Sequence, residues 1–464
     1  MNYDFLIIGG GSAGYAAART AASLGLKTCV VDGAAELGGL CILRGCMPSK
    51  TLLESSSRFA TLRRAREFGL RAEGLEIHGD EILARKRRII GGFASYRQEQ
   101  LANGTFTLVR GTARFADPQS VEVTLREGGT QRISARAFLL ATGSVVSDVP
   151  LTSLKEVGFW TSDDLLESAT IPDSIIILGG GATAVEFATY FAGLGREVTI
   201  IQRSEQLLKG ADRDVADALA EGLRARGVKV FTGTKLLNAE RAGDLKRVTF
   251  EHVGEMKRVE AVQILHALGR SPNLHGLVLE NAGVELSQSR PVMHATQQTS
   301  QPNIFAAGDA CGPYEVVHIA IQQGEIAARN AARILSGDSA QLEEMDYRLK
   351  LYAVFSDPEV ACVGRTEPEL TAAGIAFRSA KYPFNDHGKS QCMGETDGFV
   401  KLLAATGTGE ILGGACVGPH AAELIHEIVV AMRFRATAAD LASTPHYHPT
   451  LSEIWTYPAE ELAG

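Results

Sequence analysis

The stretch that decides the fold is DFLIIGGGSAG, residues 4–14. Its apolar run of aliphatic and β-branched residues is typical of a buried parallel strand, and its glycines are typical of the turn into a helix. An Ala-rich segment with helical periodicity follows, and residues 27–31 form a second apolar run. The pattern therefore predicts a strand–helix–strand unit at the start of the chain.

The same pattern returns at residues 174–184, SIIILGGGATA, with its second strand at residues 197–201. Two such units predict two nucleotide-binding domains of the doubly wound type. A third signal, NIFAAGDA at residues 303–310, predicts a short strand and a Gly-Asp turn, followed by a helix from about His318. We assign this third segment to the first domain.

From about Tyr347 the sequence changes to short strand-like stretches separated by turns, with a helix from about Ala421. We therefore expect an α/β protein with two doubly wound Rossmann-like domains and a C-terminal α+β domain. The expected segments are a first nucleotide-binding part (1–148), a second nucleotide-binding domain (149–272), a return to the first domain (273–346) and the C-terminal domain (347–464).

Composition excludes several classes of protein. The 464 residues are 45% apolar and 22% charged, which is typical of globular chains, and the net charge of −8 argues against a nucleic-acid surface. The start MNYDFLIIGGG has no basic region or cleavage signal, and no apolar run is long enough for a membrane span. Seven cysteines are an odd number, and most of them stand far apart, which does not resemble the disulfide framework of a secreted domain. We expect a cytoplasmic protein that binds neither membrane nor nucleic acid.

The first glycine motif has the form GxGxxG, at Gly9, Gly11 and Gly14. Glycines at this spacing let the turn pass close to a pyrophosphate, which binds at the helix N-terminus. Asp32, at the end of the next strand, is placed to bind ribose hydroxyls. The alternative is that the glycines serve only a tight turn.

The second motif has the form GxGxxA, at Gly179, Gly181 and Ala184. The offset that joins Gly9 to Asp32 leads here to Gln202, so the acid is missing, and Arg203 and Lys209 follow it. An Arg guanidinium pairs well with a 2′-phosphate, which favours NADPH at this site, with NADH as the alternative. Arg203 and Lys209 could instead be solvated loop charges.

Two cysteines stand close together in GGLCILRGCMPSK, residues 38–50. In an ideal helix the Cα atoms of Cys41 and Cys46 would be about 8 to 9 Å apart, beyond the reach of a disulfide, so a bridge requires a distorted turn. Gly45 and Pro48 suit such a turn, and a helix N-terminus just beyond would favour the thiolate of Cys46. The alternatives are two unrelated buried thiols or half of a zinc site, for which no complementary Cys or His cluster is present.

The other cysteines stand singly, and we expect them to be small buried apolar residues. They are Cys29, Cys311, Cys362, Cys392 and Cys416.

Further motifs follow in order along the whole chain: FLLATGS from Phe138, ALGRSPN from Ala267, AAGDA around Asp309, SDPEVACVG from Ser356 and HPTLSE from His448 to Glu453. With these the sequence resembles the class I pyridine nucleotide–disulfide oxidoreductases, the family of dihydrolipoamide dehydrogenase, glutathione reductase and mercuric reductase. The resemblance implies FAD in the first domain, a nicotinamide nucleotide in the second, and a C-terminal dimerisation domain that forms a homodimer.

The resemblance also implies residue roles. Asp32 would bind the adenosine ribose of FAD and Asp309 its ribityl chain, while Lys50 would pair with Glu186 beside the flavin. Further cofactor contacts would come from Ala113, Thr142, Gly143 and Gly269.

The catalytic residues implied by the resemblance are the two cysteines and a histidine with its acid. Cys46 would face the flavin, and Cys41 would exchange with the substrate sulfur. His448, from the partner subunit, would be the base and acid for the thiols, oriented by Glu453. His446 would support it.

The substrate features point in two directions. His318 and the PSK after Cys46 match dihydrolipoamide dehydrogenases, whereas Gln202 stands where those enzymes have an acid. Arg19 falls where glutathione reductases place an arginine, but Glu325 would repel an anionic substrate. The end AEELAG lacks the cysteine pair of mercuric reductases.

We therefore expect an enzyme that moves electrons between NADPH, or NADH, and a small disulfide or lipoyl group. A lipoyl-carrier protein is a possible partner that would present the lipoyl group. The alternatives are a glutathione-type reductase of low-molecular-weight disulfides, a diaphorase or quinone reductase that does not use the dithiol, and a non-catalytic scaffold. Cys41→Ser would leave turnover largely intact only in a dithiol-independent enzyme.

Overall fold

The computed structural model describes residues 2–338 and 340–464. The chain divides into two compact units, each built from three segments. The first unit contains residues 1–48, 84–147 and 270–346, and the second contains residues 49–83, 148–269 and 347–464. The mixed α/β architecture with two Rossmann-like sheets confirms the expected fold class. The finer division into four segments stays a prediction.

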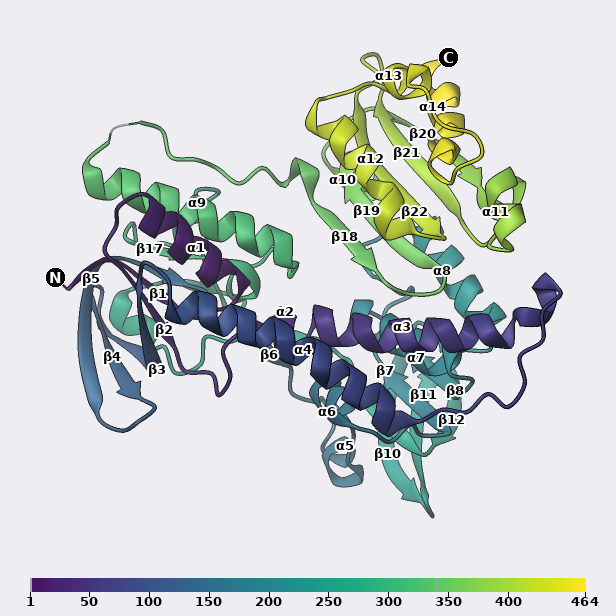
Figure 1. The fold of residues 1–464 in the computed structure, drawn as a ribbon, viewed down its shortest axis with the longest axis horizontal. Coiled ribbons are helices and arrows are strands. Elements are labelled where there is room, and N and C mark those ends of the chain that lie inside the picture. The colour runs from purple at the N-terminus through teal and green to yellow at the C-terminus, as the bar shows by residue number, and fades with distance from the viewer. Residues whose placement is uncertain (1, 339) are drawn as a thin grey trace. The chain divides into compact units, whose positions relative to one another are not determined.

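The first unit is built on a six-stranded sheet (Figure 1). Its strand order is β1 (Tyr3–Ile8), β2 (Thr28–Asp32), β3 (Thr107–Asp117), β4 (Ser120–Leu125), β5 (Thr130–Leu140) and β17 (Ile304–Ala306), with β1 also paired to β5. The pairs β1–β2, β1–β5, β2–β3 and β5–β17 are parallel, and β3, β4 and β5 extend as antiparallel strands. Two short strands, β6 (Ser144–Val146) and β14 (Arg270–Pro272), pair beside it.

The alternation of side chains in β1 builds two cores, because successive residues of a strand point to opposite faces. Phe5 and Ile7 pack against the helices α1 (Ser12–Ser23) and α9 (Val317–Ser336), which lie side by side in Figure 1. Leu6 and Ile8 pack into a core on the other face. The small alanines of α1 and α9 let both helices approach the sheet closely, which positions the turn between β1 and α1.

The second unit contains the other parallel sheet, with the order β13 (Gln263–His266), β7 (Ser174–Leu178), β8 (Glu197–Ile201) and β9 (Lys229–Phe231). Both β7 and β8 have the bounds that the sequence predicts. The helices α5 (Thr152–Val157), α6 (Ser162–Glu167), α7 (Ala182–Gly193) and α8 (Arg213–Ala225) accompany it. An antiparallel sheet of β10 (Thr234–Ala242), β11 (Leu245–His252) and β12 (Glu255–Ala261) completes this part.

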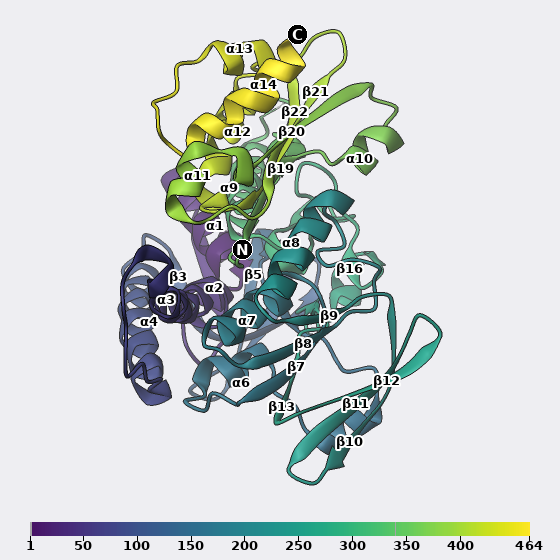
Figure 2. The same cartoon turned by 90° about the vertical axis from the view of Figure 1, so that its right-hand side faces the viewer.

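The C-terminal part of the second unit is an antiparallel sheet of five strands, seen beside its helices in Figure 2. The order is β18 (Leu351–Val354), β19 (Glu359–Gly364), β22 (Ile411–Gly418), β21 (Phe399–Ala405) and β20 (Phe377–Pro383). The helices α12 (Ala421–Arg433), α13 (Ala438–Ser443) and α14 (Thr456–Ala463) cover a core that includes the fully buried Trp455. The helix α12 begins where the sequence predicts it.

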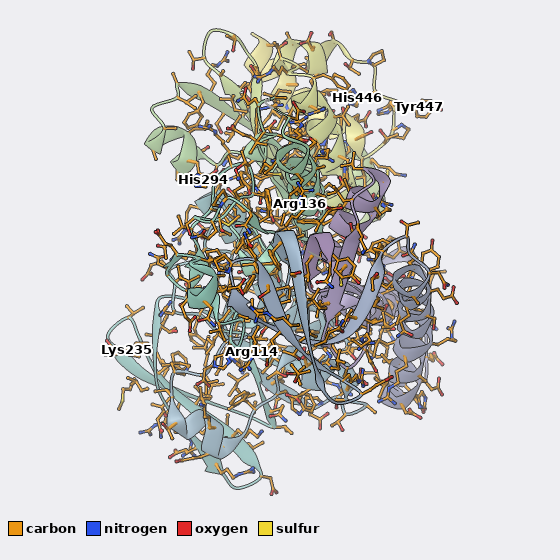
Figure 3. The ribbon with its side chains drawn as sticks, turned by 90° about the vertical axis from the view of Figure 1, so that its left-hand side faces the viewer. Arg114, Arg136, Lys235, His294, His446 and Tyr447 are labelled. Carbon is orange, nitrogen blue, oxygen red and sulfur yellow. The ribbon has the colours of Figure 1, made fainter. Side chains whose placement is uncertain are left out.

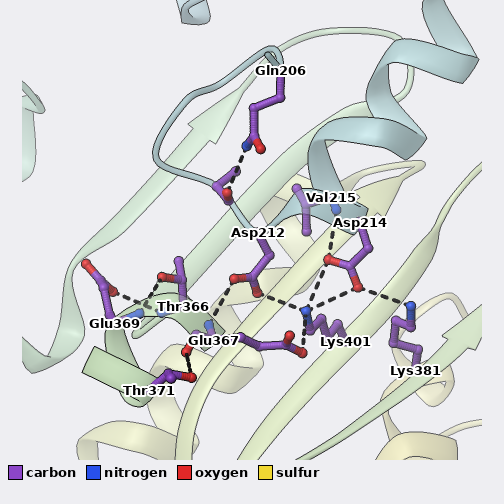
Figure 4. Close-up of polar contacts among 11 residues, drawn as sticks. Gln206, Asp212, Asp214, Val215, Thr366, Glu367, Glu369, Thr371, Lys381 and Lys401 are labelled. Atoms are coloured by element: carbon purple, nitrogen blue, oxygen red, sulfur yellow. Dashed lines mark hydrogen bonds and ion pairs between the residues drawn. The ribbon is translucent and has the colours of Figure 1, made fainter. Parts of the chain in front are cut away.

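A buried lysine joins α8 to this C-terminal sheet (Figure 4). The Nζ atom of Lys401, on β21, lies 2.9 Å from Asp212, 3.1 Å from Asp214 and 2.8 Å from Glu367. The Lys401 side chain is 1% exposed, and burial alone would lower its pKa, but hydrogen bonds to Glu367 and Asp212 and the carboxylate charges raise the pKa overall. The cation is held charged inside the unit.

Within residues 2–338 and 340–464, none of the helices combines the length and the apolar character that crossing a bilayer requires.

Candidate active site

The first glycine motif forms a tight turn between β1 and α1. Gly9 has φ of +107°, and a Cβ on Gly14 would lie 1.8 Å from the Gly9 carbonyl oxygen, so neither position accepts a side chain. Gly11 precedes the first residue of α1, which leaves the backbone N–H groups of the helix N-terminus open to a phosphate. The geometry fits a dinucleotide pyrophosphate.

Asp32, the last residue of β2, is held beside this turn. Its Oδ2 accepts the Gly10 N–H at 2.7 Å, and its Oδ1 accepts the Ala34 N–H at 2.8 Å. The carboxylate therefore shapes the phosphate turn and the loop after β2. Each carboxylate oxygen has a second lone pair, which can accept a ribose hydroxyl.

The remaining expected FAD contacts come from β3, from the segment after β5 and from the turn after β17. The Thr142 hydroxyl is buried with no hydrogen-bond partner among the described residues, and Gly143 has φ of +70°. Ser144 donates to Asp309 Oδ2 at 2.7 Å. Ala113 is buried in β3, where it pairs with Val123 of β4 and packs into a core. An orphan hydroxyl, a glycine turn and a carboxylate near the nucleotide turn fit FAD.

The cysteine segment contains the break that a disulfide requires. Cys41 lies in α2 (Gly39–Leu43), the helix ends before Arg44, and α3 (Cys46–Arg63) begins at Cys46. Both cysteines are half-buried. Since Cys46 starts a helix, the helix dipole favours its thiolate form. Gly39, whose Cβ would lie 2.6 Å from the Cα of Gly11, packs this segment against the phosphate turn.

An arginine that the sequence did not single out lies on the same unit, on α4 (Gly79–Ala102). The Arg97 guanidinium lies 4.1 Å from the centre of the Tyr15 ring. Burial lowers the pKa of Arg97, and the opposite effects of Tyr15 and Cys41 offset this only in part. Arg19, on α1 with Tyr15, lies 3.7 Å from Glu325. Glu325 therefore partly neutralises Arg19. No motif marks Arg97, since a lone arginine on a helix has no sequence signature.

In the second unit, Lys50 and Glu186 form the expected contact. Lys50 Nζ lies 2.8 Å from Oε1 and 2.9 Å from Oε2, and the Phe355 N–H donates to Oε1 at 3.2 Å. The Glu186 side chain is only 7% exposed, whereas that of Lys50 is 31% exposed. The carboxylate is thus fixed and the ammonium stays partly open.

The second glycine motif repeats the geometry of the first. Gly179 has φ of +121°, with its Cβ position 2.2 Å from the Ala267 carbonyl oxygen, and Gly181 precedes α7. Ala184 is fully buried, and Gly269 has φ of +127°. The side chains of Arg203 and Lys209, after β8, are exposed. Exposed cations at the end of the second strand suit a charged ribose substituent.

His448 and Glu453 also form the expected contact. His448 Nδ1 lies 2.9 Å from Glu453 Oε2; the imidazole is 80% exposed and the carboxylate 12%. His446 Nε2 lies 2.5 Å from Glu427 Oε1, and the neighbouring Tyr447 is exposed at the periphery of the fold (Figure 3). The loop therefore presents His448 outward while Glu453 fixes its inner nitrogen.

A second histidine, missed by the sequence reasoning, touches the same carboxylate. His387 Nε2 lies 3.4 Å from Glu453 Oε1, and the His387 ring is fully buried. No motif distinguishes this histidine, since it is brought to Glu453 only by the fold.

Four of the five remaining cysteines are buried, as expected: Cys29, Cys311, Cys362 and Cys416. Burial raises the pKa of Cys29, Cys311 and Cys362 to about 12. The expectation was wrong for Cys392, which is exposed on the short helix α11 (Gly388–Met393) because that helix lies at the surface.

Comparison with known families assigns the chain. Residues 3–324 match the model of the family "Pyridine nucleotide-disulphide oxidoreductase", and residues 351–459 match the dimerisation domain of that family. The chain belongs to the pyridine nucleotide-disulphide oxidoreductases, and it is an FAD-dependent enzyme of that family that uses NAD(P)H. The expected family and its dimerisation domain are thereby confirmed.

Relatives match over nearly the full length. The chain is 36% identical to a dihydrolipoyl dehydrogenase of Thermus scotoductus, over 99% of this chain and 97% of the relative. It is 32% identical to a dihydrolipoyl dehydrogenase of Bacillus subtilis, over 97% of this chain and 96% of the relative. Among solved structures, LpdA of Mycobacterium tuberculosis superposes with a TM-score of 0.86 at 30% identity, with 99% of each chain covered. The Cu(II) complex of the HOCl-induced flavoprotein disulfide reductase RclA of Escherichia coli superposes with a TM-score of 0.85 at 26% identity, again with 99% of each chain covered.

Proposed function

We propose that this enzyme moves electrons between NADPH and a small disulfide, and that Cys41 and Cys46 are its redox pair. The proposal rests on the break between α2 and α3, which separates Cys41, within the short helix α2, from Cys46, the first residue of α3. Two cysteines five residues apart in one continuous helix could not form a bridge, and the break between the two helices removes that obstacle.

When bound, FAD would supply the two-electron chemistry that links the nicotinamide to the disulfide. The turn at Gly9 and Gly11 would hold its pyrophosphate, and Asp32 its ribose. Asp309 and the Thr142 hydroxyl would bind the rest of the cofactor. Lys50, anchored by Glu186, would place a positive charge beside the ring, while its partial exposure lets the charge reach a ligand.

Cys41 would react with the substrate, and Cys46 would stay on the cofactor side. When the reduced Cys41 thiolate attacks a substrate disulfide, one substrate thiolate leaves and needs a proton. Attack by Cys46 then releases the second thiol and closes the Cys41–Cys46 bridge. The two electrons of the dithiol end on the two product thiols, so the step balances.

His448 would supply and remove these protons. Glu453 accepts the Nδ1–H of His448, which leaves Nε2 as the site that exchanges protons. The imidazole is 80% exposed within one chain, as expected for a group that completes its site on a second subunit. We therefore propose a homodimer in which His448 acts on the dithiol of the other subunit.

The preference for NADPH is supported by the exposed Arg203 and Lys209 and by Gln202 in place of an acid. A carboxylate would repel the 2′-phosphate, whereas Arg forms paired hydrogen bonds with it. The relatives named dihydrolipoyl dehydrogenase favour a lipoyl group as the disulfide, in a cytoplasmic enzyme that accepts it free or on a carrier protein. The ion pair of Arg19 with Glu325 weakens a glutathione-type carboxylate site.

The experiment is anaerobic stopped-flow reduction of the holoenzyme by NADPH and NADH in parallel, followed by reoxidation with lipoamide or glutathione disulfide. We expect faster reduction by NADPH, a long-wavelength absorbance band from the Cys46 thiolate, and reoxidation by lipoamide. Preference for NADH would overturn the role of Arg203. Reoxidation by neither disulfide would overturn the proposed function.

A further inference from the structure

Glu453 is held from two sides. Its Oε2 lies 2.9 Å from His448 Nδ1, and its Oε1 lies 3.4 Å from His387 Nε2. The first histidine is 80% exposed and the second is fully buried. A carboxylate with a single partner can rotate about its last bond, whereas one with a partner on each oxygen keeps its plane fixed. The buried histidine is therefore in position to fix the orientation of the acid.

The surroundings of His387 fix its own orientation. Its Nδ1 lies 2.9 Å from the hydroxyl of the buried Ser390, and its ring packs edge-on against Phe384 and Tyr457, with centroids 6.5 Å apart in both cases. Tyr457 is in turn stacked on Tyr382 at 3.9 Å. The ring is thus closed in by aromatic walls and tied at one nitrogen.

The hydrogen bond with Ser390 determines which nitrogen of His387 carries the proton. A hydroxyl can donate to an unprotonated Nδ1, which leaves the proton of a neutral imidazole on Nε2, the atom that faces Glu453. The pKa of His387 is lowered, chiefly by burial. Glu453 acts in the opposite direction, and a positive charge on His448 acts in the same direction as burial. The titratable groups that face this ring are Glu453, His448 and Tyr457.

We propose that His387 is a positioning residue for the proton transfer at His448, and that Ser390, His387, Glu453 and His448 form one chain of polar contacts. In this chain Ser390 sets the tautomer of His387, and His387 Nε2 faces one oxygen of Glu453 at 3.4 Å, a polar contact rather than a hydrogen bond. Glu453 uses its other oxygen to hold the Nδ1–H of His448. Nε2 of His448 is then directed outward as the proton acceptor. The inference rests on the proposed role of His448 in disulfide turnover.

The variant that tests it is His387→Phe, which keeps a ring and removes both nitrogens. We expect kcat/KM for the disulfide to fall about tenfold, the effect of losing one polar contact to a charged group. The acid limb of its pH profile should move to higher pH, because a carboxylate that loses a donor stabilises the His448 imidazolium more strongly. His387→Gln keeps an N–H donor and should restore both the rate and the profile.

The control for packing is Phe384→Leu, which loosens the same ring without removing a polar group. Equal loss in His387→Phe, His387→Gln and Phe384→Leu, or an unchanged pH profile in His387→Phe, would overturn the inference. Anaerobic flavin reduction by NADPH should be unaffected in all three, since it precedes the proton transfer.

His448→Gln separates this inference from the proposed function. If His448→Gln slows disulfide turnover and His387→Phe does not, only the role of His387 is wrong. If His448→Gln has no effect, the proposed function itself is wrong at this step.

Discussion

Lys50 Nζ contacts both carboxylate oxygens of Glu186, at 2.8 and 2.9 Å. The pair joins the helix that begins at Cys46 to the helix that follows the second glycine motif, α7. A buried carboxylate is stable in its charged form only while a cation or donor faces it. The Lys50 ammonium therefore stabilises the fold of this unit by neutralising Glu186, and it is also the charge that we propose to lie beside the flavin.

We predict that Lys50→Met lowers the free energy of unfolding by about 2 to 3 kcal/mol, less than for a fully buried pair because Lys50 is partly exposed. Flavin reduction by NADPH should slow at least about tenfold, since the charge beside the ring is lost. Thermal unfolding and stopped-flow absorbance measure the two effects. Lys155→Met is the matched control, because Lys155 pairs with the exposed Asp148 at the surface; equal effects in both variants would contradict the prediction.

Arg203→Gln should reduce kcat/KM for NADPH about tenfold to a hundredfold and leave that for NADH nearly unchanged, because a bidentate contact with a phosphate is worth about 1.5 to 3 kcal/mol. Steady-state kinetics with both nucleotides measure the ratio. Arg224→Gln, at an exposed arginine of α8, is the control and should leave the ratio as in the wild type. An unchanged ratio in Arg203→Gln would mean that Arg203 is a solvated loop charge.

Lys401→Met should cost about 3 to 5 kcal/mol of stability at pH 7, because three carboxylates lose the cation between them. The pKa of Asp214 is lowered: burial would raise it, but the charge of Lys401 and hydrogen bonds from Lys401 and Lys381 outweigh burial. A lowered carboxyl pKa contributes stability above the ordinary value of 3.8, and this contribution is lost as pH falls below that value.

The difference in stability between wild type and Lys401→Met should therefore shrink below about pH 4, once the carboxylates are protonated. Denaturant unfolding between pH 3 and pH 7 measures it. Lys381→Met is the control, since Lys381 contacts only the edge of the cluster, at 3.1 Å from Asp214, and is 48% exposed. We expect it to cost at most about 1 kcal/mol. A difference that stays constant with pH would contradict the account.

The exposed Cys392 should be alkylated rapidly by N-ethylmaleimide in the native protein, whereas Cys29, Cys311, Cys362 and Cys416 should resist. Burial excludes the reagent from these four and raises their pKa values, so the thiolate is scarce at neutral pH. Peptide mass spectrometry after a short pulse identifies the modified residues. Modification of Cys362 before Cys392 would show that the C-terminal sheet opens.

Much of the fold could be predicted from the sequence, because both nucleotide-binding units carry their strands as continuous apolar runs. The bounds of β7 and β8 agree with the prediction, and β2 differs by one residue at each end. The break between Cys41 and Cys46 was predictable for a different reason: disulfide geometry forbids a continuous helix there.

The parts of the site that sequence could not show are contacts made only by the fold. His387 lies 66 residues from Glu453 and belongs to no motif. Arg97 contacts the Tyr15 ring from α4, a helix that begins only at Gly79. The exposure of Cys392 depends on which face of a single-turn helix meets the core, and a stretch of six residues carries too little periodicity to decide it.

We propose that electrons leave the enzyme through Cys41 and Cys46, and turnover of the Cys41→Ser holoenzyme, with Cys392→Ser as the control, tests this proposal directly. We predict that Cys41→Ser is still reduced by NADPH and retains the long-wavelength absorbance of the Cys46 thiolate. Its disulfide reduction should fall at least about a thousandfold, because the attacking sulfur is gone. Cys392→Ser should behave as the wild type. Disulfide turnover in Cys41→Ser at the wild-type rate would contradict the account and favour a flavin reductase that does not use the dithiol.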